Sequence, residues 1–131
     1  MISTAQLIAQ FIDLIKTYLH INAAYRKAGV RNPLRRQELR QARNTAYHAT
    51  QQANTTLHQH LLKFPEPDAI MLQARELIRL WDIRNTCFDN LTNRSPDDPP
   101  REAITRLNRA EKNLTDQLQI IENIIKTQST N

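Results

Sequence analysis

The sequence of 131 residues contains a single glycine, Gly29, and a single cysteine, Cys87. Sheet folds need glycine at turns and bulges, and Rossmann or phosphate-loop sites need several glycines in one loop. A lone cysteine excludes an internal disulfide and a cysteine-based zinc site. These scarcities argue against β folds, glycine-rich nucleotide sites and disulfide scaffolds, and they favour a helical protein of the cytoplasm.

Long apolar runs are also missing. No stretch approaches 18 uninterrupted apolar residues, and Gln6, Gln10, Asp13 and Lys16 interrupt the apolar positions near the N-terminus. A membrane-spanning helix and a signal peptide both need an uninterrupted apolar core. We therefore expect no membrane span and no signal peptide. With 40% hydrophobic and 24% charged residues, the chain has the composition of a folded protein.

The six prolines divide the chain into four long segments, because they gather at only three places, at 33, 65–67 and 96–100. Within each segment apolar residues recur at spacings of three and four, which is typical of amphipathic helices. We predict helices over residues 3–28, 34–63, 68–92 and 101–128. Short connections favour antiparallel neighbours, so the expected fold is all-α, an up-down-up-down four-helix bundle in a single domain, 1–131.

Local signals support three of the helix ends. Ser3 and Gln6 have the spacing of a capping box, Gly29 suits a left-handed C-terminal cap, and Asp68 suits an N-cap. The second segment has a narrow stripe of small residues that would let a neighbouring backbone come close, formed by Leu39, Ala42, Ala46, Ala49, Ala53 and Leu57.

Positive charge is concentrated in one short segment. Between residues 26 and 43 there are seven basic residues against Glu38 alone, a local net charge of +6, whereas the rest of the chain has eleven basic and twelve acidic side chains, a net charge of −1. The basic residues are Arg26, Lys27, Arg31, Arg35, Arg36, Arg40 and Arg43. Such a surface suits anionic lipid headgroups or an acidic partner, and the alternative is a solvated helix face. Nucleic acid is the least favoured partner, because no aromatic residues alternate with the arginines.

Metal and cofactor sites are not expected. The four histidines form no His-Glu-x-x-His pair, and no carboxylate stands at the Glu-x-x-His spacing of di-iron bundles. One catalytic pattern occurs: residues 43–48 follow Arg-Asn-x-x-x-His, which resembles the motif of the HEPN ribonucleases. That resemblance implies that Arg43 and His48 of paired subunits meet at an RNA phosphodiester. In an uninterrupted helix, however, positions five residues apart diverge by about 140°.

Two charged residues interrupt apolar stripes. Arg84 lies between Trp81 and Phe88, and Glu111 lies between Leu107 and Leu114. In antiparallel helices these two positions fall at similar heights, so we expect a partly buried ion pair that fixes helix register. The alternative is that both side chains extend to solvent.

The segment from Tyr25 to Pro67 resembles a known family. Its motifs are Tyr25-Arg26, Arg40-Gln41-Ala42-Arg43, Ala46, Ala49, Asn54-Thr55-Thr56-Leu57, Leu61-Leu62 and a closing Pro65-Glu66-Pro67. Together with the leucine pattern that follows to about residue 92, they resemble the soluble C-terminal region of the fusaric acid resistance-like (FUSC, YccS-type) bacterial inner-membrane proteins. Members of that family are regarded as transporters or exporters of aromatic carboxylic acids and related toxic compounds.

The resemblance implies a non-enzymatic accessory domain with a regulatory, structural or oligomerising role. Such a domain lies on the cytoplasmic side of the bacterial inner membrane, and its expected contacts are the transmembrane portion of the same protein, identical subunits and anionic lipid. The chain would then be a cytoplasmic fragment of a larger membrane protein. Two alternatives are a HEPN-like ribonuclease or toxin that uses Arg43 and His48, and a free helical adaptor.

Overall fold

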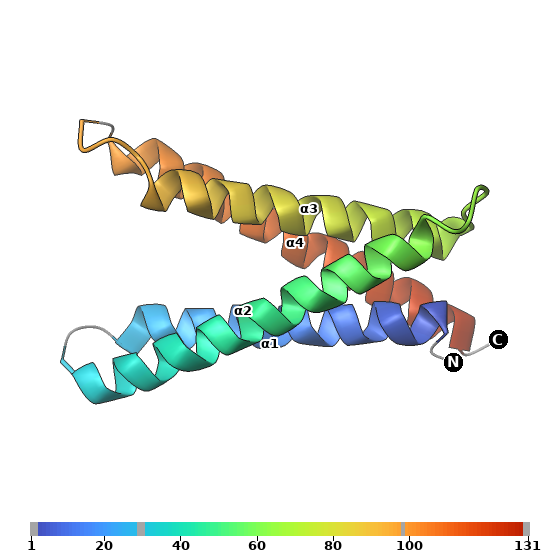
Figure 1. Ribbon diagram of the computed structural model, residues 1–131, viewed down its shortest axis with the longest axis horizontal. Coiled ribbons are helices and arrows are strands. Elements are labelled where there is room, and N and C mark those ends of the chain that lie inside the picture. Colours follow the sequence, from blue (N-terminus) through green and yellow to red (C-terminus); the bar gives the residue numbers. More distant parts are fainter. Residues whose placement is uncertain (1–2, 29–30, 98, 130–131) are drawn as a thin grey trace. The chain divides into compact units, whose positions relative to one another are not determined.

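The four predicted helices are confirmed. The computed structural model describes residues 3–28, 31–97 and 99–129, and its elements are α1 (Thr4–Ala28), α2 (Pro33–Leu61), α3 (Ala69–Thr92) and α4 (Pro100–Ser129) (Figure 1). No strand occurs among the described residues. Every predicted helix end agrees with the observed one to within two residues. The all-α, four-helix architecture follows from this agreement.

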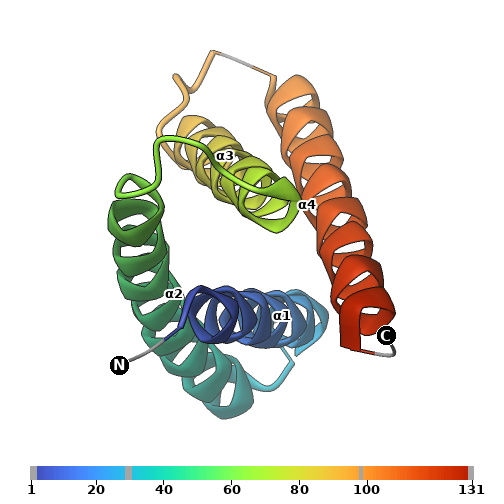
Figure 2. The ribbon, with the colours of Figure 1, turned by 90° about the vertical axis from the view of Figure 1, so that its right-hand side faces the viewer.

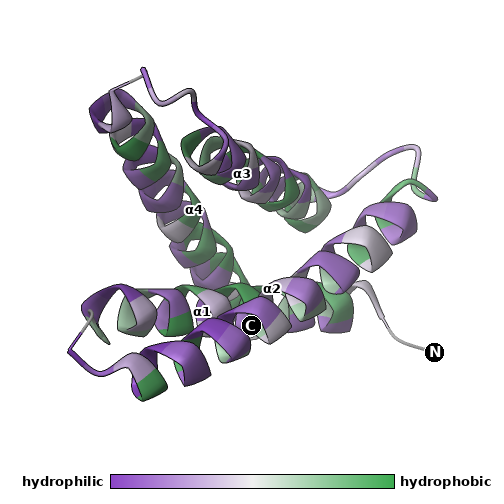
Figure 3. Cartoon of the chain, turned by 60° about the vertical axis from the view of Figure 1, so that its left-hand side comes forward, coloured by the Kyte–Doolittle hydropathy of each residue, from purple (hydrophilic) through white to green (hydrophobic). Residues whose placement is uncertain are grey.

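The helices pack in consecutive pairs. The chain divides into two compact units, residues 1–65 and 66–131, and each unit is a helical hairpin whose second helix runs back along the first (Figure 1, Figure 2). All four helices carry both hydrophobic and hydrophilic residues along their length (Figure 3).

Side chains cap three helix starts. The backbone N–H of Gln6 donates to Ser3 Oγ at 3.2 Å while that of Ser3 donates to Gln6 Oε1 at 2.9 Å, so the predicted capping box is present. Asp68 Oδ1 accepts from the N–H of Met71 at 3.0 Å, as predicted. A third cap, not predicted from the sequence, is Asn32, which accepts from the N–H of Arg35 at 3.1 Å at the start of α2. The predicted C-cap, Gly29, lies outside the described residues.

The α1–α2 hairpin buries apolar side chains of both helices, together with Thr50. Its buried hydrophobic residues are Leu7, Ile8, Phe11, Ile12, Ile15, Tyr18, Leu39, Ala46, Leu57 and Leu61. The hydroxyl of Thr50 donates to its own helix at Ala46 O (2.7 Å) and approaches Leu14 O of α1 at 3.2 Å. The two backbones therefore come close here, as the small residues predict. Ala42 of the predicted stripe is exposed, and Thr50 is a buried member that the stripe does not include.

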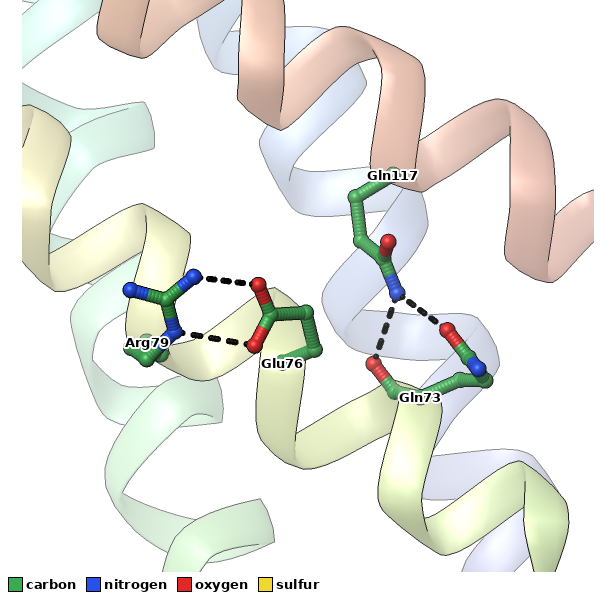
Figure 4. A network of polar contacts seen from close by, with 4 residues as sticks. All are labelled: Gln73, Glu76, Arg79 and Gln117. Carbon is green, nitrogen blue, oxygen red and sulfur yellow. Dashed lines mark hydrogen bonds and ion pairs between the residues drawn. The ribbon is translucent and has the colours of Figure 1, made fainter.

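The α3–α4 hairpin also contains a buried polar contact. Gln117 of α4 is only 6% exposed, and its amide donates to Gln73 of α3 at the backbone O (3.1 Å) and at Oε1 (2.8 Å) (Figure 4). The hairpin also buries apolar side chains along both helices, namely Met71, Ala74, Leu77, Ile78, Leu80, Trp81, Leu107, Ala110, Leu114, Leu118 and Ile121. Ile104 shares the three- and four-residue apolar spacing of α4 with Leu107, but it is 44% exposed and lies outside this core.

Candidate functional site

The seven basic residues gather at the end of the α1–α2 hairpin where the two helices are connected. Arg26 and Lys27 lie in the last turn of α1, Arg31 precedes α2, and the other four lie in the first three turns of α2. We call this set, Arg26, Lys27, Arg31, Arg35, Arg36, Arg40 and Arg43, the basic end. Residues that are close in the sequence therefore also lie at one end of a packed helix pair.

Tyr25 organises two of these arginines. The Cζ atoms of Arg36 and Arg43 lie 4.9 and 4.4 Å from the centroid of its ring, which are cation–π distances. Arg36 Nη2 also donates to the Tyr25 hydroxyl at 3.4 Å. This hydrogen bond, and then the positive charges of Arg36, Arg43 and Arg40, lower the pKa of Tyr25. Arg36 and Arg43 are consequently half-buried and join α2 to α1.

The remaining members of the basic end are exposed. Arg35 forms an ion pair with Glu38 at 3.5 Å, but these side chains are 59% and 69% exposed, so the pair contributes little stability. Lys27, Arg31 and Arg40 are exposed as well. The basic end therefore combines two arginines that pack on Tyr25 with a group of cations that face solvent. It can attract an extended anionic surface.

Tyr25 is not among the predicted site residues. Its signal in the sequence is its place in the apolar spacing of the first helix, one turn before the chain reverses. Which arginines pack on it depends on the face that α2 presents to α1, and the charge count does not contain that information.

Arg43 and His48 point to different neighbours. Helix α2 is continuous through both residues, so no bend brings them together. Arg43 stacks on Tyr25, whereas His48 is exposed and its ring centroid lies 5.8 Å from that of Tyr47 in an edge-on arrangement. Within one chain the two side chains do not converge on a common point.

Arg84 and Glu111 form an ion pair between α3 and α4. Arg84 Nη2 lies 3.4 Å from Glu111 Oε1, and the Arg84 side chain is 1% exposed while that of Glu111 is 17% exposed. A second nitrogen of Arg84 donates to Asn85 Oδ1 at 3.2 Å, and the guanidinium lies 5.0 Å from the centroid of the Phe88 ring. These partners are all internal to the hairpin, so the pair is a structural feature.

In the part of the chain that the structure describes, no three His, Cys, Asp or Glu side chains lie close enough to hold one metal ion.

Two further polar features lie outside the basic end. His60 Nε2 lies 2.7 Å from the hydroxyl of Thr4, and this contact joins the start of α1 to the end of α2. An open, polar cavity of about 430 Å³ adjoins the α3–α4 connection. One of its two arginines, Arg106, is paired with Glu102 at 3.6 Å.

Among the described residues, none of the helices combines the length and the apolar character that a membrane crossing requires. Comparisons with protein-family models, with curated proteins and with solved structures find no match to this chain.

Proposed function

We propose that this chain is a non-enzymatic accessory domain of a FUSC-type inner-membrane transporter, and that its basic end contacts anionic lipid headgroups on the cytoplasmic side. The observation that carries the proposal is the gathering of seven basic residues, against one acidic residue, at one end of the α1–α2 hairpin. The resemblance of residues 25–92 to the soluble region of FUSC proteins supplies the membrane setting.

Electrostatics supports this assignment. The cytoplasmic leaflet is negatively charged, and it attracts basic residues near its surface by about 1 kcal/mol each. The attraction decays over a Debye length of about 8 Å, so cations must be gathered at one place to act together. Lys27, Arg31 and Arg35 satisfy that condition best, because they are exposed in the last turn of α1, just before α2 and in the first turn of α2.

The same resemblance implies two protein contacts, with the transmembrane portion and with identical subunits. A domain in this position would couple the membrane-embedded helices to one another or to a regulator. In this proposal the basic end orients the domain, and its role is to position the remaining surface against the membrane-embedded helices.

Vesicle co-sedimentation tests the proposal. At low salt the chain should bind vesicles that contain phosphatidylglycerol and should bind vesicles of phosphatidylcholine much less. The triple variant Lys27→Gln, Arg31→Gln, Arg35→Gln should lose about 100-fold in affinity, because three contacts of about 1 kcal/mol each are removed.

A matched control removes the same charge elsewhere. Arg101, Arg109 and Lys112 are exposed on α4, and their replacement by glutamine also lowers the net charge by three. This control should change the affinity only slightly. Equal binding of the wild-type chain to both kinds of vesicle, or equal losses in the two triple variants, would overturn the proposal.

A further inference from the structure

A large apolar side chain is exposed within the basic end. Leu34 lies in the first turn of α2, next to Arg35 and three residues after Arg31, and it is 74% exposed. Leu62, just beyond the other end of α2, is 67% exposed but lies outside the basic end. An exposed leucine therefore lies at each end of α2, and only Leu34 is within the basic end.

The start of α2 holds Leu34 in a defined position. Pro33 fixes the backbone at the first helical residue, and Asn32 caps the helix through the N–H of Arg35 at 3.1 Å. Leu34 lies between these two fixed points. Its exposure is consequently a property of an ordered helix start.

We infer that Leu34 inserts into the boundary between headgroups and acyl chains of an anionic bilayer, so that the α1–α2 hairpin docks on its end. An apolar side chain surrounded by exposed cations is the combination that interfacial membrane segments use, because the cations contact phosphates while the apolar group enters the acyl boundary. This inference rests on the proposed function, since it specifies how the basic end meets lipid.

Docking on the end, and not along the side, follows from the arrangement of the arginines. Leu34 and Arg36 are separated by about 160° around the helix, so no single side of α2 presents both to a flat surface. Arg36 and Arg43 of that side are already stacked on Tyr25. At the end of the hairpin, by contrast, Arg31 and Arg35 are exposed close to Leu34 along the chain, and Lys27 is exposed in the last turn of α1.

A pair of leucine variants tests the insertion. Leu34→Ser should weaken binding to phosphatidylglycerol vesicles about tenfold, the effect of withdrawing one leucine from an apolar environment, and it should leave the preference for anionic vesicles intact. Leu62→Ser, the matched control, should bind like the wild type. Both side chains are exposed, so neither change should alter the helix content measured by circular dichroism.

Tryptophan reporters test the orientation. Leu34→Trp should shift its fluorescence to the blue on addition of anionic vesicles and should be quenched by brominated lipid. Asn44 is exposed ten residues along α2, about 15 Å away, so the reporter in Asn44→Trp should remain in water. Trp81 is fully buried and provides the same background in every variant.

The outcomes separate this inference from the proposed function. If the wild type prefers anionic vesicles but Leu34→Ser binds these vesicles with the same affinity as the wild type, the inference is wrong and the proposed function stands. A blue shift in the Asn44→Trp variant without one in the Leu34→Trp variant would indicate side-on docking and would also overturn the inference. If the wild type shows no preference for anionic vesicles, the proposed function itself fails.

Discussion

The buried Arg84–Glu111 ion pair gives the sharpest test of the packing of α3 on α4. Replacing Glu111 with glutamine keeps the shape of the side chain and removes its charge, which leaves a fully buried guanidinium without its carboxylate. We expect the α3–α4 hairpin to be substantially destabilised.

The geometry sets the magnitude. Two unit charges 3.4 Å apart attract each other by about 5 kcal/mol at an effective dielectric constant near 20. The Glu111 side chain is 17% exposed, so solvent reduces this attraction, and glutamine retains a hydrogen-bond acceptor. Removal of one partner from a buried pair typically costs about 3–5 kcal/mol. We therefore expect Glu111→Gln to lower the free energy of unfolding by about 3 kcal/mol.

Urea denaturation followed by the fluorescence of Trp81 is the appropriate measurement, because Trp81 is the only tryptophan and lies in α3. Glu76→Gln is the control, since Glu76 pairs with Arg79 on the surface with side chains that are 39% and 59% exposed, and its loss should cost less than about 0.5 kcal/mol. The double variant Arg84→Met, Glu111→Leu should be close to the wild type in stability, because neither charge is left unpaired. A value for Glu111→Gln as small as that for Glu76→Gln would refute the reasoning.

Three further predictions concern the titration of Tyr25, the cap of α3 and the Arg43–His48 motif. The hydrogen bond from Arg36 lowers the pKa of Tyr25 in the folded chain. Between this lowered pKa and the unfolded value near 10, only the folded chain has lost the Tyr25 proton, so the free energy of unfolding should increase as the pH rises through this range. Tyr25→Phe should remove the earliest phase of tyrosinate absorbance at about 295 nm in an alkaline titration. Asp68→Ala should cost about 1 kcal/mol of unfolding free energy in urea, and Asp68→Asn should restore most of it. Arg43→Ala should lower the melting temperature because its stacking on Tyr25 is lost, and the exposed His48→Ala should not, whereas a ribonuclease would lose activity on RNA with either change.

The helices could be predicted from the sequence because their signals are local. Proline breaks, the Ser3–Gln6 capping box and the Asp68 cap act within a few residues, and each lies at or near an observed helix end. The basic end could be predicted for the same reason, since its members are close in the sequence and lie in the last turn of α1, just before α2 and in the first turns of α2.

The polar residues inside the hairpins could not be predicted, because their burial depends on the facing helix. In α2 the inward positions include Arg43 and Thr50, so a stripe traced through small and apolar residues is displaced toward the exposed Ala42. In α4 the half-buried position is Ala103 and not Ile104, which lies about 100° further around the helix. Gln117 is buried only because Gln73 supplies acceptors for its amide.

The polar contacts of the α3–α4 hairpin restrict how this hairpin can move. A slide of α4 along α3 by one helical turn, about 5.4 Å, would break both hydrogen bonds of Gln117 and separate Arg84 from Glu111 at the same time. Purely apolar helix pairs lack such directional contacts and can shift past each other at lower cost. The two helices should therefore keep their register, so that a displacement at one end of the hairpin moves the hairpin as a rigid unit.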